Sequence, residues 1–346
     1  MKRLQRQSRH PEGFLVTLPL ARSSIRAAPD QTLLAAALAA GVDYPHGCKS
    51  GRCGSCKSRL ASGSVTMLPH SRFSLTDEEK AAGLILACRA VPQSDVTVMW
   101  SRGDAEAGHR RKQVEGIVTS VSSATHDILK VHVTLGGEDF RFSAGQYVKL
   151  TVGKRLVRDY SIASVPGGRE LEFHVRKVPN GLVSSHIHEE LWVGDKVMVE
   201  GPFGDAHLRS LHTGPILAVA GGSGLAPIRS IVETALSSGM RQPIRLYFGV
   251  REERDAYDVD LLDRLAGDHP NFSYQVVTSR SDSARFRVGH VSAAIDADLC
   301  LLEGWKAYVA GPPAMVEAVA EGVFAAGLGT DDFHADVFFT PEAIAD

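Results

Sequence analysis

The chain has 346 residues, of which 44% are hydrophobic and 23% charged, and its formal net charge is −2. This length exceeds what one hydrophobic core serves, so we expect two or three soluble globular domains rather than a fibrous or disordered chain. The basic segment of residues 1–13 leads into no apolar stretch, and no run of about 18 apolar residues occurs, so we expect a cytoplasmic protein without membrane contact.

The charge is unevenly distributed along the chain. Residues 1–100 carry 13 Lys or Arg against 7 Asp or Glu, and the remaining residues therefore carry 25 against 33. No basic patch with interleaved aromatic residues accompanies the positive part, so the asymmetry favours protein partners and not nucleic acid.

The first hundred residues have the pattern of a small mixed α+β domain. A short helix is expected within residues 29–41, with Asp30 as its cap and Gly41 at its end, and a second one after Thr76, where acidic residues follow. Strands are expected at residues 14–20, 23–27, 84–90 and 95–100. Residues 101–112 lack apolar periodicity, so we expect them to form a linker.

The rest of the chain divides into two further patterns. Residues 113–209 contain short strands between glycine-rich turns, which predicts a small antiparallel barrel; the strands are expected at residues 115–122, 128–135, 146–152, 170–178 and 196–201. One helical segment is expected near residues 184–191. Residues 210–346 alternate strand, glycine turn and helix, which predicts a parallel sheet with crossover helices.

Four cysteines in the first ninety residues are candidate ligands. Cys48, Cys53 and Cys56 have C-x4-C-x2-C spacing, and Cys88 follows 32 positions later. The loop alone is compatible with zinc, a redox dithiol, a disulfide or an iron–sulfur cluster. Four cysteines at this spacing are typical of a plant-type [2Fe-2S] site, whereas structural zinc usually takes two close pairs, so zinc or free thiols are the weaker alternatives. Cys300 is expected to be a buried apolar residue.

Two further segments suit nucleotides, although each alone is weak evidence. In "RDYSIAS", residues 158–164, Arg158, Tyr160 and Ser161 offer a cation, a flat ring and a hydroxyl, which suits a flavin; downstream, Gly181-x-x-Ser184 opens a helix and offers an anion site. "AVAGGSGLAPI", residues 218–228, and "AGPPAM", residues 310–315, are glycine turns at the ends of expected strands, where α/β sheets bind ligands.

Together these segments resemble the ferredoxin–NADP reductase superfamily, and within it the iron–sulfur flavoprotein reductases of naphthalene-type ring-hydroxylating dioxygenases. The resemblance covers nearly all of residues 14–339. It implies an N-terminal ferredoxin β-grasp domain (residues 1–100), a linker (101–112), an antiparallel FAD-binding β-barrel (113–209) and a parallel-sheet NAD(P)-binding α/β domain (210–346).

The resemblance also implies roles for single residues. The catalytic residues would be Tyr160, packed on the isoalloxazine, and Ser161, near flavin N5. The other expected cofactor contacts are Arg158 on FAD phosphate; His174, Val175 and Lys177 on the adenine side; Gly181 and Ser184 on the FAD pyrophosphate; Gly221, Gly222, Ser223 and Gly224 on the nicotinamide cofactor's pyrophosphate; Gly311 and Pro312 beside the nicotinamide; and Phe338 or Phe339 over the flavin. The expected cluster ligands are Cys48, Cys53, Cys56 and Cys88.

The implied activity is electron transfer from NAD(P)H through FAD and a [2Fe-2S] cluster to a Rieske ferredoxin or a terminal oxygenase, by a monomer. A reductase of a diiron monooxygenase or deoxysugar pathway, or a stand-alone oxidoreductase with small acceptors, are the alternatives. We expect NADH to be preferred and NADPH tolerated, because acids follow "YFGV" whereas serine and arginines occupy residues 279–287. We expect a ring of basic residues around the cluster with no acid nearby, made of Lys49, Arg52, Lys57 and Arg59. Such a ring predicts an acidic acceptor face.

Overall fold

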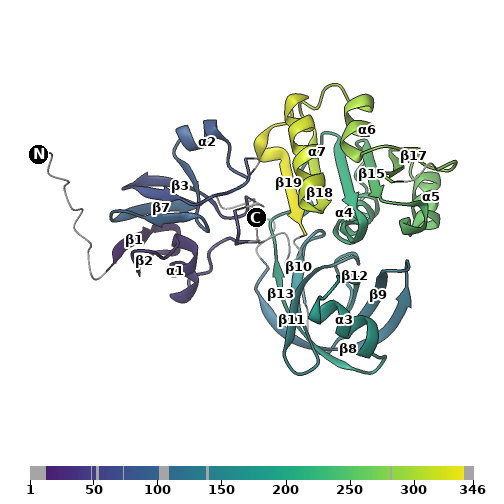
Figure 1. Ribbon diagram of the computed structural model, residues 1–346, viewed down its shortest axis with the longest axis horizontal. Helices are drawn as coiled ribbons and strands as arrows, with labels where there is room; N and C mark the ends of the chain where they lie inside the picture. Colours follow the sequence, from purple (N-terminus) through teal and green to yellow (C-terminus); the bar gives the residue numbers. More distant parts are fainter. Residues whose placement is uncertain are drawn as a thin grey trace, which may run out of the picture. The chain divides into compact units, whose positions relative to one another are not determined.

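The structure is a computed structural model that describes residues 13–47, 49–51, 54–72, 74–100, 109–137, 140–280 and 283–338 (Figure 1). The chain divides into two compact units, residues 1–103 and 104–346. Across the described ranges, every helix is too short or too polar to cross a membrane.

The first unit is built on a mixed sheet of five strands. Their order is β2 (Ser23–Ala27), β1 (Phe14–Leu18), β7 (Val96–Trp100), β3 (Lys57–Ser62) and β5 (Leu84–Leu86), while β4 (Val65–Met67) pairs with β6 (Ala90–Pro92). The helices are α1 (Leu33–Ala39) and α2 (Asp77–Ala81). Buried faces of this sheet and of α1 form one hydrophobic core, which also includes Cys56 and Cys88.

The helix caps in this unit test two sequence predictions. Thr76 caps α2 as expected and forms a capping box with Glu79, whose carboxylate accepts the Thr76 amide. The prediction for α1 was wrong, because Thr32 and not Asp30 provides the cap: the Thr32 hydroxyl accepts the amide of Ala35. The cap of α1 is therefore the hydroxyl directly before its first apolar turn, and not the acid two residues earlier.

The second unit contains an antiparallel barrel and a parallel sheet. The barrel strands are β8 (Lys112–Ser123), β9 (Ile128–Leu135), β10 (Tyr147–Val152), β11 (Leu156–Ser161), β12 (Glu170–Arg176) and β13 (Lys196–Phe203), paired in the order β11-β10-β13-β8-β9-β12. A bridge between Ile162 and Phe173 joins the two ends of this row and closes the barrel. Helix α3 (Leu182–Glu190) lies against the strands (Figure 1).

The parallel sheet has the strand order β17 (Arg287–Val288), β16 (Phe272–Thr278), β15 (Ile244–Val250), β14 (Ile216–Gly221), β18 (Lys306–Gly311) and β19 (Phe333–Val337). Its helices are α4 (Leu225–Ser237), α5 (Val259–Asp268), α6 (Val291–Asp298) and α7 (Pro313–Ala325). Because α4 leads from β14 to β15 and the later chain returns to β18 on the other side, the strand order reverses between β14 and β18. Such a reversal leaves a crevice at the carboxyl ends of these strands.

The sequence explains the central position of β14. All six residues of this strand are buried, as expected for a parallel strand covered on both faces. Gly224 allows the start of α4 to approach β18, since a Cβ there would lie 2.1 Å from the carbonyl oxygen of Ala310. The predicted fold class, with a mixed N-terminal domain, an antiparallel barrel and a parallel α/β sheet, is confirmed. Cys300 is exposed, so its predicted burial was wrong.

Candidate functional site

Two of the four expected cluster ligands lie in the described part of the first unit. Cys56 and Cys88 are 3% and 5% exposed, and the amide of Cys88 donates to the sulfur of Cys56 over 3.5 Å. Two buried cysteines, one of whose sulfurs accepts a hydrogen bond from a backbone amide, fit thiolate ligation, because an amide donor stabilises a negatively charged sulfur. Cys48 and Cys53 lie outside the described residues.

The loop around these cysteines is tightly folded at Gly51. Its φ of +76° is a left-handed conformation, and a Cβ would lie 2.6 Å from Arg89 Cγ and 2.8 Å from His70 Cβ. The Gly51 carbonyl accepts the Ser71 amide and the Ser74 hydroxyl. The backbone at Gly51 is therefore held in place by the segment that follows the cysteine motif.

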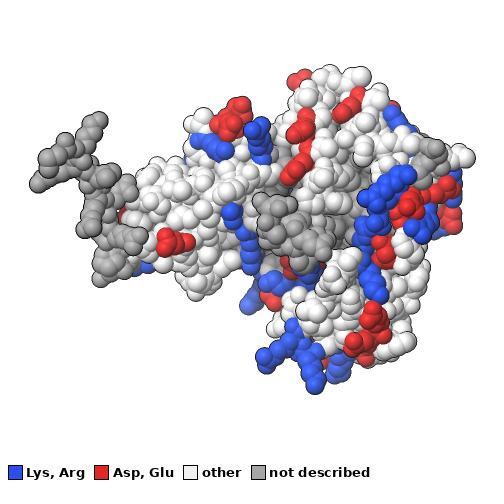
Figure 2. All heavy atoms as spheres, in the orientation of Figure 1, with Lys and Arg blue, Asp and Glu red and all other residues white. Residues whose placement is uncertain are grey.

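The basic residues near this loop are less free than the sequence indicated. Lys57 forms an ion pair with Glu79 at 2.6 Å, and Arg59 donates to the Ala82 carbonyl. Figure 2 shows acidic and basic side chains next to one another over α2, whose first turn contains three acids. The expectation of a basic ring without a neighbouring acid was therefore wrong at Lys57, because the fold brings α2 beside β3 and its neighbour β5.

In the second unit, Ser161 lies where the barrel meets the parallel sheet. Its hydroxyl donates to the Asp336 carboxylate over 2.6 Å, and Asp336 pairs with Ala310 across strands β19 and β18. Two residues after Asp336, the Phe338 amide donates to the carbonyl of Gly311, which directly follows Ala310. The structure thus brings the expected flavin residue Ser161 to the same edge as the expected nicotinamide residue Gly311. Sequence reasoning missed Asp336, although its place two residues before Phe338 was a usable signal.

The other expected flavin residues of strand β11 lie nearby. Arg158 is exposed and Tyr160 is half-buried, and strand alternation places their side chains on one face of β11. Burial raises the pKa of Tyr160 far above its ordinary value, so its ring is neutral. A neutral aromatic ring beside an exposed cation suits a flat, phosphate-bearing group. Phe338 is half-buried, and Phe339 lies outside the described residues.

The imidazole of His174 has partners within the protein at both ring nitrogens. Its Nδ1 lies 2.8 Å from the Tyr257 hydroxyl and its Nε2 lies 3.0 Å from Glu172, and the side chain is fully buried. Arg229 of α4 donates two hydrogen bonds, of 2.8 and 2.9 Å, to the same Glu172. The imidazole therefore links the barrel to the nucleotide-binding domain through the partners of its two ring nitrogens. Its expected place on the adenine side of FAD stays a prediction.

Two neighbours of His174 were also expected to contact the adenine. Val175 is completely buried in the barrel core. Lys177 is exposed and forms an ion pair with Glu189 of α3. At the start of the same helix, the Ser184 hydroxyl accepts the Val178 amide and donates to the Gly181 carbonyl. These hydrogen bonds fix the turn that leads into α3.

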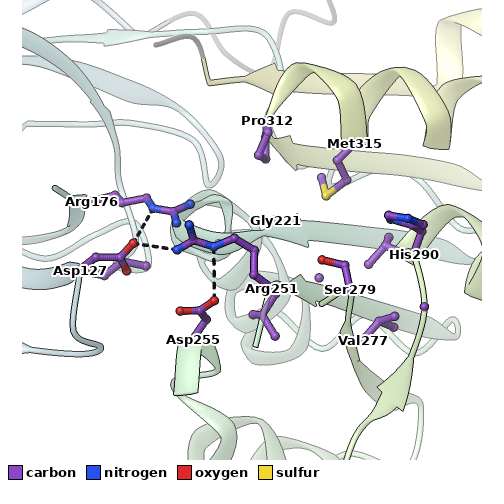
Figure 3. A pocket seen from close by; sticks show the side chains of 16 residues that line it. Asp127, Arg176, Gly221, Arg251, Asp255, Val277, Ser279, His290, Pro312 and Met315 are labelled. Carbon is purple, nitrogen blue, oxygen red and sulfur yellow. Dashed lines mark hydrogen bonds and ion pairs between the residues drawn. The ribbon is translucent and has the colours of Figure 1, made fainter. Parts of the chain in front are cut away.

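The carboxyl ends of the parallel strands line a pocket, shown in Figure 3. Gly221, Gly222 and Pro312 are among its lining residues, and Gly311 lies directly beside it: a Cβ on Gly311 would lie 3.1 Å from Gly221 Cα. Of the other expected nucleotide residues, Ser223 is half-buried, and Gly224 is buried against β18. The pocket lies at the strand-order reversal, as a nucleotide site in such a sheet does.

Four charged residues also line the pocket, and of these only Asp255 is among the acids after "YFGV" that the sequence assigned to the nicotinamide nucleotide. Asp127 and Arg176 come from the barrel, and Arg251 and Asp255 follow β15. His126, Asp127 and Asp255 lie close enough to one another to share a metal ion. However, Arg251 pairs with both carboxylates and Arg176 with Asp127, so this group is an ion-pair network.

Comparison with known proteins agrees with this geometry. Three family models match: a 2Fe-2S iron–sulfur cluster binding domain over residues 20–93, an oxidoreductase FAD-binding domain over 115–208 and an oxidoreductase NAD-binding domain over 218–321. The chain is 40% identical to the reductase component of the naphthalene 1,2-dioxygenase system of Pseudomonas putida, over 86% of this chain and 90% of the relative. The chain belongs to the ferredoxin–NAD(P)+ reductase family of iron–sulfur flavoproteins.

Other relatives support the same membership. A Ralstonia reductase component of naphthalene 1,2-dioxygenase and salicylate 5-hydroxylase systems is 40% identical over 94% of this chain and 98% of its own. The solved structure of an Amycolatopsis cytochrome P450 reductase is 34% identical, with a TM-score of 0.73, and covers 94% of this chain and 98% of its own. The predicted enzyme class, an NAD(P)H-dependent iron–sulfur flavoprotein oxidoreductase, and the predicted cofactors [2Fe-2S], FAD and NAD(P)H are confirmed.

Proposed function

We propose that this reductase serves a multicomponent oxygenase and passes electrons from NAD(P)H to a Rieske ferredoxin or directly to a terminal aromatic-ring dioxygenase. The full-length similarity to two reductase components of naphthalene 1,2-dioxygenase systems supports this assignment. The proposed domain boundaries are residues 1–100, 101–112, 113–209 and 210–346, which agree with the segments matched by the family models.

The observation that carries the proposal is the hydrogen bond between Ser161 and Asp336. Ser161 ends the strand expected to hold the flavin, and Asp336 pairs with Ala310, one residue before the expected nicotinamide residue Gly311. The bond therefore keeps a hydroxyl at the place where the two cofactors must meet. FAD, when bound, would supply two-electron acceptance from a hydride donor and release of single electrons to the cluster.

The side chains bind and orient, and none has to act as an acid or a nucleophile. Tyr160 and Arg158 offer a neutral ring surface and a cation to FAD. Cys48, Cys53, Cys56 and Cys88 would hold the cluster, with the Cys88 amide already donating to a ligand sulfur. Gly221 and Gly222 let the nicotinamide nucleotide approach the backbone at the end of β14.

The test begins with the purified protein. Absorbance between about 330 and 600 nm, together with iron, sulfide and flavin content, should show a [2Fe-2S] flavoprotein. NADH should then reduce both centres anaerobically and support reduction of a Rieske ferredoxin, with NADPH slower. A colourless, zinc-containing protein, or one whose flavin neither nucleotide reduces, would refute the proposal.

A second candidate acceptor is a cytochrome P450. It is favoured by the similarity to the Amycolatopsis P450 reductase structure and to an Amycolatopsis aromatic O-demethylase reductase subunit, which is 38% identical over 84% of this chain. The reduced protein, offered a Rieske ferredoxin and a bacterial P450 in parallel, should reduce the ferredoxin faster. The reverse order would assign it to the P450 class.

A further inference from the structure

A buried tyrosine joins the two ends of the cysteine loop in the first unit. Tyr44 precedes the first cysteine of the C-x4-C-x2-C motif by four residues, and Ser58 follows the third cysteine by two. The Tyr44 hydroxyl oxygen lies 2.6 Å from Ser58 Oγ, and the two residues are 0% and 1% exposed. One hydrogen bond inside the core therefore closes residues 44–58, the segment that contains three of the four expected cluster ligands.

The direction of this hydrogen bond follows from the next one. Ser58 Oγ also lies 3.1 Å from the carbonyl oxygen of Cys56. Because a carbonyl oxygen only accepts, Ser58 uses its single hydrogen there, and the Tyr44 hydroxyl donates to Ser58. Two hydrogen bonds thus form a directed chain from Tyr44 through Ser58 to the backbone of Cys56. Each bond in such a chain polarises the next one and strengthens it.

The neighbours of Tyr44 hold its hydroxyl in this position. Its ring packs on the ring of Trp100, with centroids 4.5 Å apart and planes tilted by 49°. Strand pairing places Trp100 of β7 opposite Ser58 of β3. The backbone is held as well, because Nδ1 of the buried His46 lies 2.8 Å from the Tyr44 carbonyl oxygen. The hydrogen-bonded chain is therefore fixed by the packing of its surroundings.

Cys56 is the residue at which this chain meets the expected cluster site. Its carbonyl also accepts the Ala87 amide over 3.1 Å, and its sulfur accepts the Cys88 amide over 3.5 Å. All three donors direct their hydrogens at Cys56, so the positive ends of their dipoles face one expected ligand. Dipoles in this orientation stabilise negative charge on a ligand sulfur and on the metal group that it holds.

We propose that Tyr44 and Ser58 are positioning residues for the [2Fe-2S] cluster, which hold the ends of its loop together and raise its reduction potential through Cys56. This inference rests on the proposed ligation by Cys56 and Cys88. Reduction adds one electron to the cluster, and the chain presents the positive ends of its dipoles to that added charge. The chain therefore stabilises the reduced form more than the oxidised form. A higher potential makes electron transfer from the flavin to the cluster more favourable.

The experiment measures the midpoint potential of the cluster in the purified full-length protein, by reductive titration followed by electron paramagnetic resonance. Tyr44→Phe removes the hydroxyl and keeps the ring on Trp100, whereas Ser58→Ala removes both hydrogen bonds of the chain. We expect the equilibrium constant for reduction to fall about threefold in Tyr44→Phe and about tenfold in Ser58→Ala. These changes correspond to potentials lower by about 30 and 60 mV for one electron. An unchanged potential in both variants, or a higher potential in either, would overturn the proposal.

The double variant tests whether Tyr44 acts through Ser58. If the tyrosine acts only through this serine, adding Tyr44→Phe to Ser58→Ala should lower the potential no further. Effects that add would overturn the chain, because Tyr44 would then act on the cluster independently. Tyr247→Phe is the matched control, since it removes a tyrosine hydroxyl that donates to Asp298 in the parallel sheet. Its cluster should have the potential of the parent protein.

A further control separates the potential from the stability of the first unit. Ile25→Val deletes one buried methyl group on β2, which two strands separate from β3, so it should lower Tm without moving the potential. Incomplete loading of a variant weakens the signal, but the midpoint of the loaded fraction stays measurable. A folded Tyr44→Phe protein that holds no iron would reveal a purely structural contact and overturn the effect on the potential. A parent protein without any cluster signal would instead refute the proposed function.

Discussion

Removing Arg229 should strongly destabilise the junction between the barrel and the nucleotide-binding domain. This arginine of α4 is 14% exposed and lies among three carboxylates: Glu172 of the barrel, Glu233 of its own helix and Asp258 before α5. In Arg229→Met the apolar stem is retained while the charge is lost. The variant therefore tests the ion pairs rather than the packing.

The magnitude follows from burial and from the partners that remain. Removing one member of a buried pair typically costs about 3–5 kcal/mol, because the other charge stays buried without compensation. Lys130 still pairs with Asp258 and lies 3.9 Å from Glu172, so we expect the lower end, about 3 kcal/mol. At about 2–4 °C for each kcal/mol, Tm should fall by about 6–12 °C.

The assay is thermal unfolding followed by flavin fluorescence, with Arg264→Met as the exposed control. The control should change stability by less than about 0.5 kcal/mol. Adding Glu172→Gln to Arg229→Met should recover part of the loss, since it removes the uncompensated charge. An Arg229→Met protein as stable as the control, or a double variant less stable than expected from adding the single effects, would refute this account of the junction.

Three other outcomes are expected. Ser161→Ala, which removes the donor to Asp336, should slow flavin reduction by NADH about tenfold or more in anaerobic stopped flow while the Kd of ADP-ribose stays the same; an unchanged rate contradicts the proposed role. Burial alone would raise the pKa of Glu172, but hydrogen bonds from His174 and Arg229 lower it far below its ordinary value. The contribution of Glu172 to stability is therefore present above about pH 4.3 and is lost as pH falls below it. The Tm of Glu172→Gln should depend less on pH in that range than the Tm of the parent protein. Arg280→Gln, at an exposed position after β16, should raise KM for NADPH about threefold or more and leave KM for NADH nearly unchanged, and equal effects on both would exclude it from choosing the cofactor.

The main architecture was predictable because local patterns carry it. The β14 segment is apolar at every position and is followed by a glycine turn and a helical period, a pattern that by itself specifies a buried parallel strand. The edge strand β19 was harder to predict from the sequence, because its five residues alternate without a long apolar run. Thr32 and Asp30 illustrate the same limit at a helix end, where two capping residues two positions apart compete and only backbone geometry decides.

The charged parts of the site could not be predicted in the same way. Asp127 and Arg251 are 124 residues apart, and no local spacing rule connects a turn of the barrel with the end of a strand in another domain. The partners of His174 were equally hidden from the sequence, because Tyr257, which lies beside its Nδ1, is 83 residues away. Charges find partners through tertiary packing, so their roles depend on contacts that periodicity does not encode.

The proposed hydride path depends on residues that two different domains provide. Ser161 is fixed by the barrel, whereas Gly311 and Asp336 are fixed by β18 and β19 of the parallel sheet. Their relative position is therefore only as well defined as the junction formed by Glu172 and Arg229. A misplacement of about 1 Å at reacting atoms can cost about a hundredfold in rate. Loosening this junction should therefore slow flavin reduction, even though Glu172 and Arg229 themselves take no part in hydride transfer. The ion pairs at the junction would then contribute to rate as well as to stability.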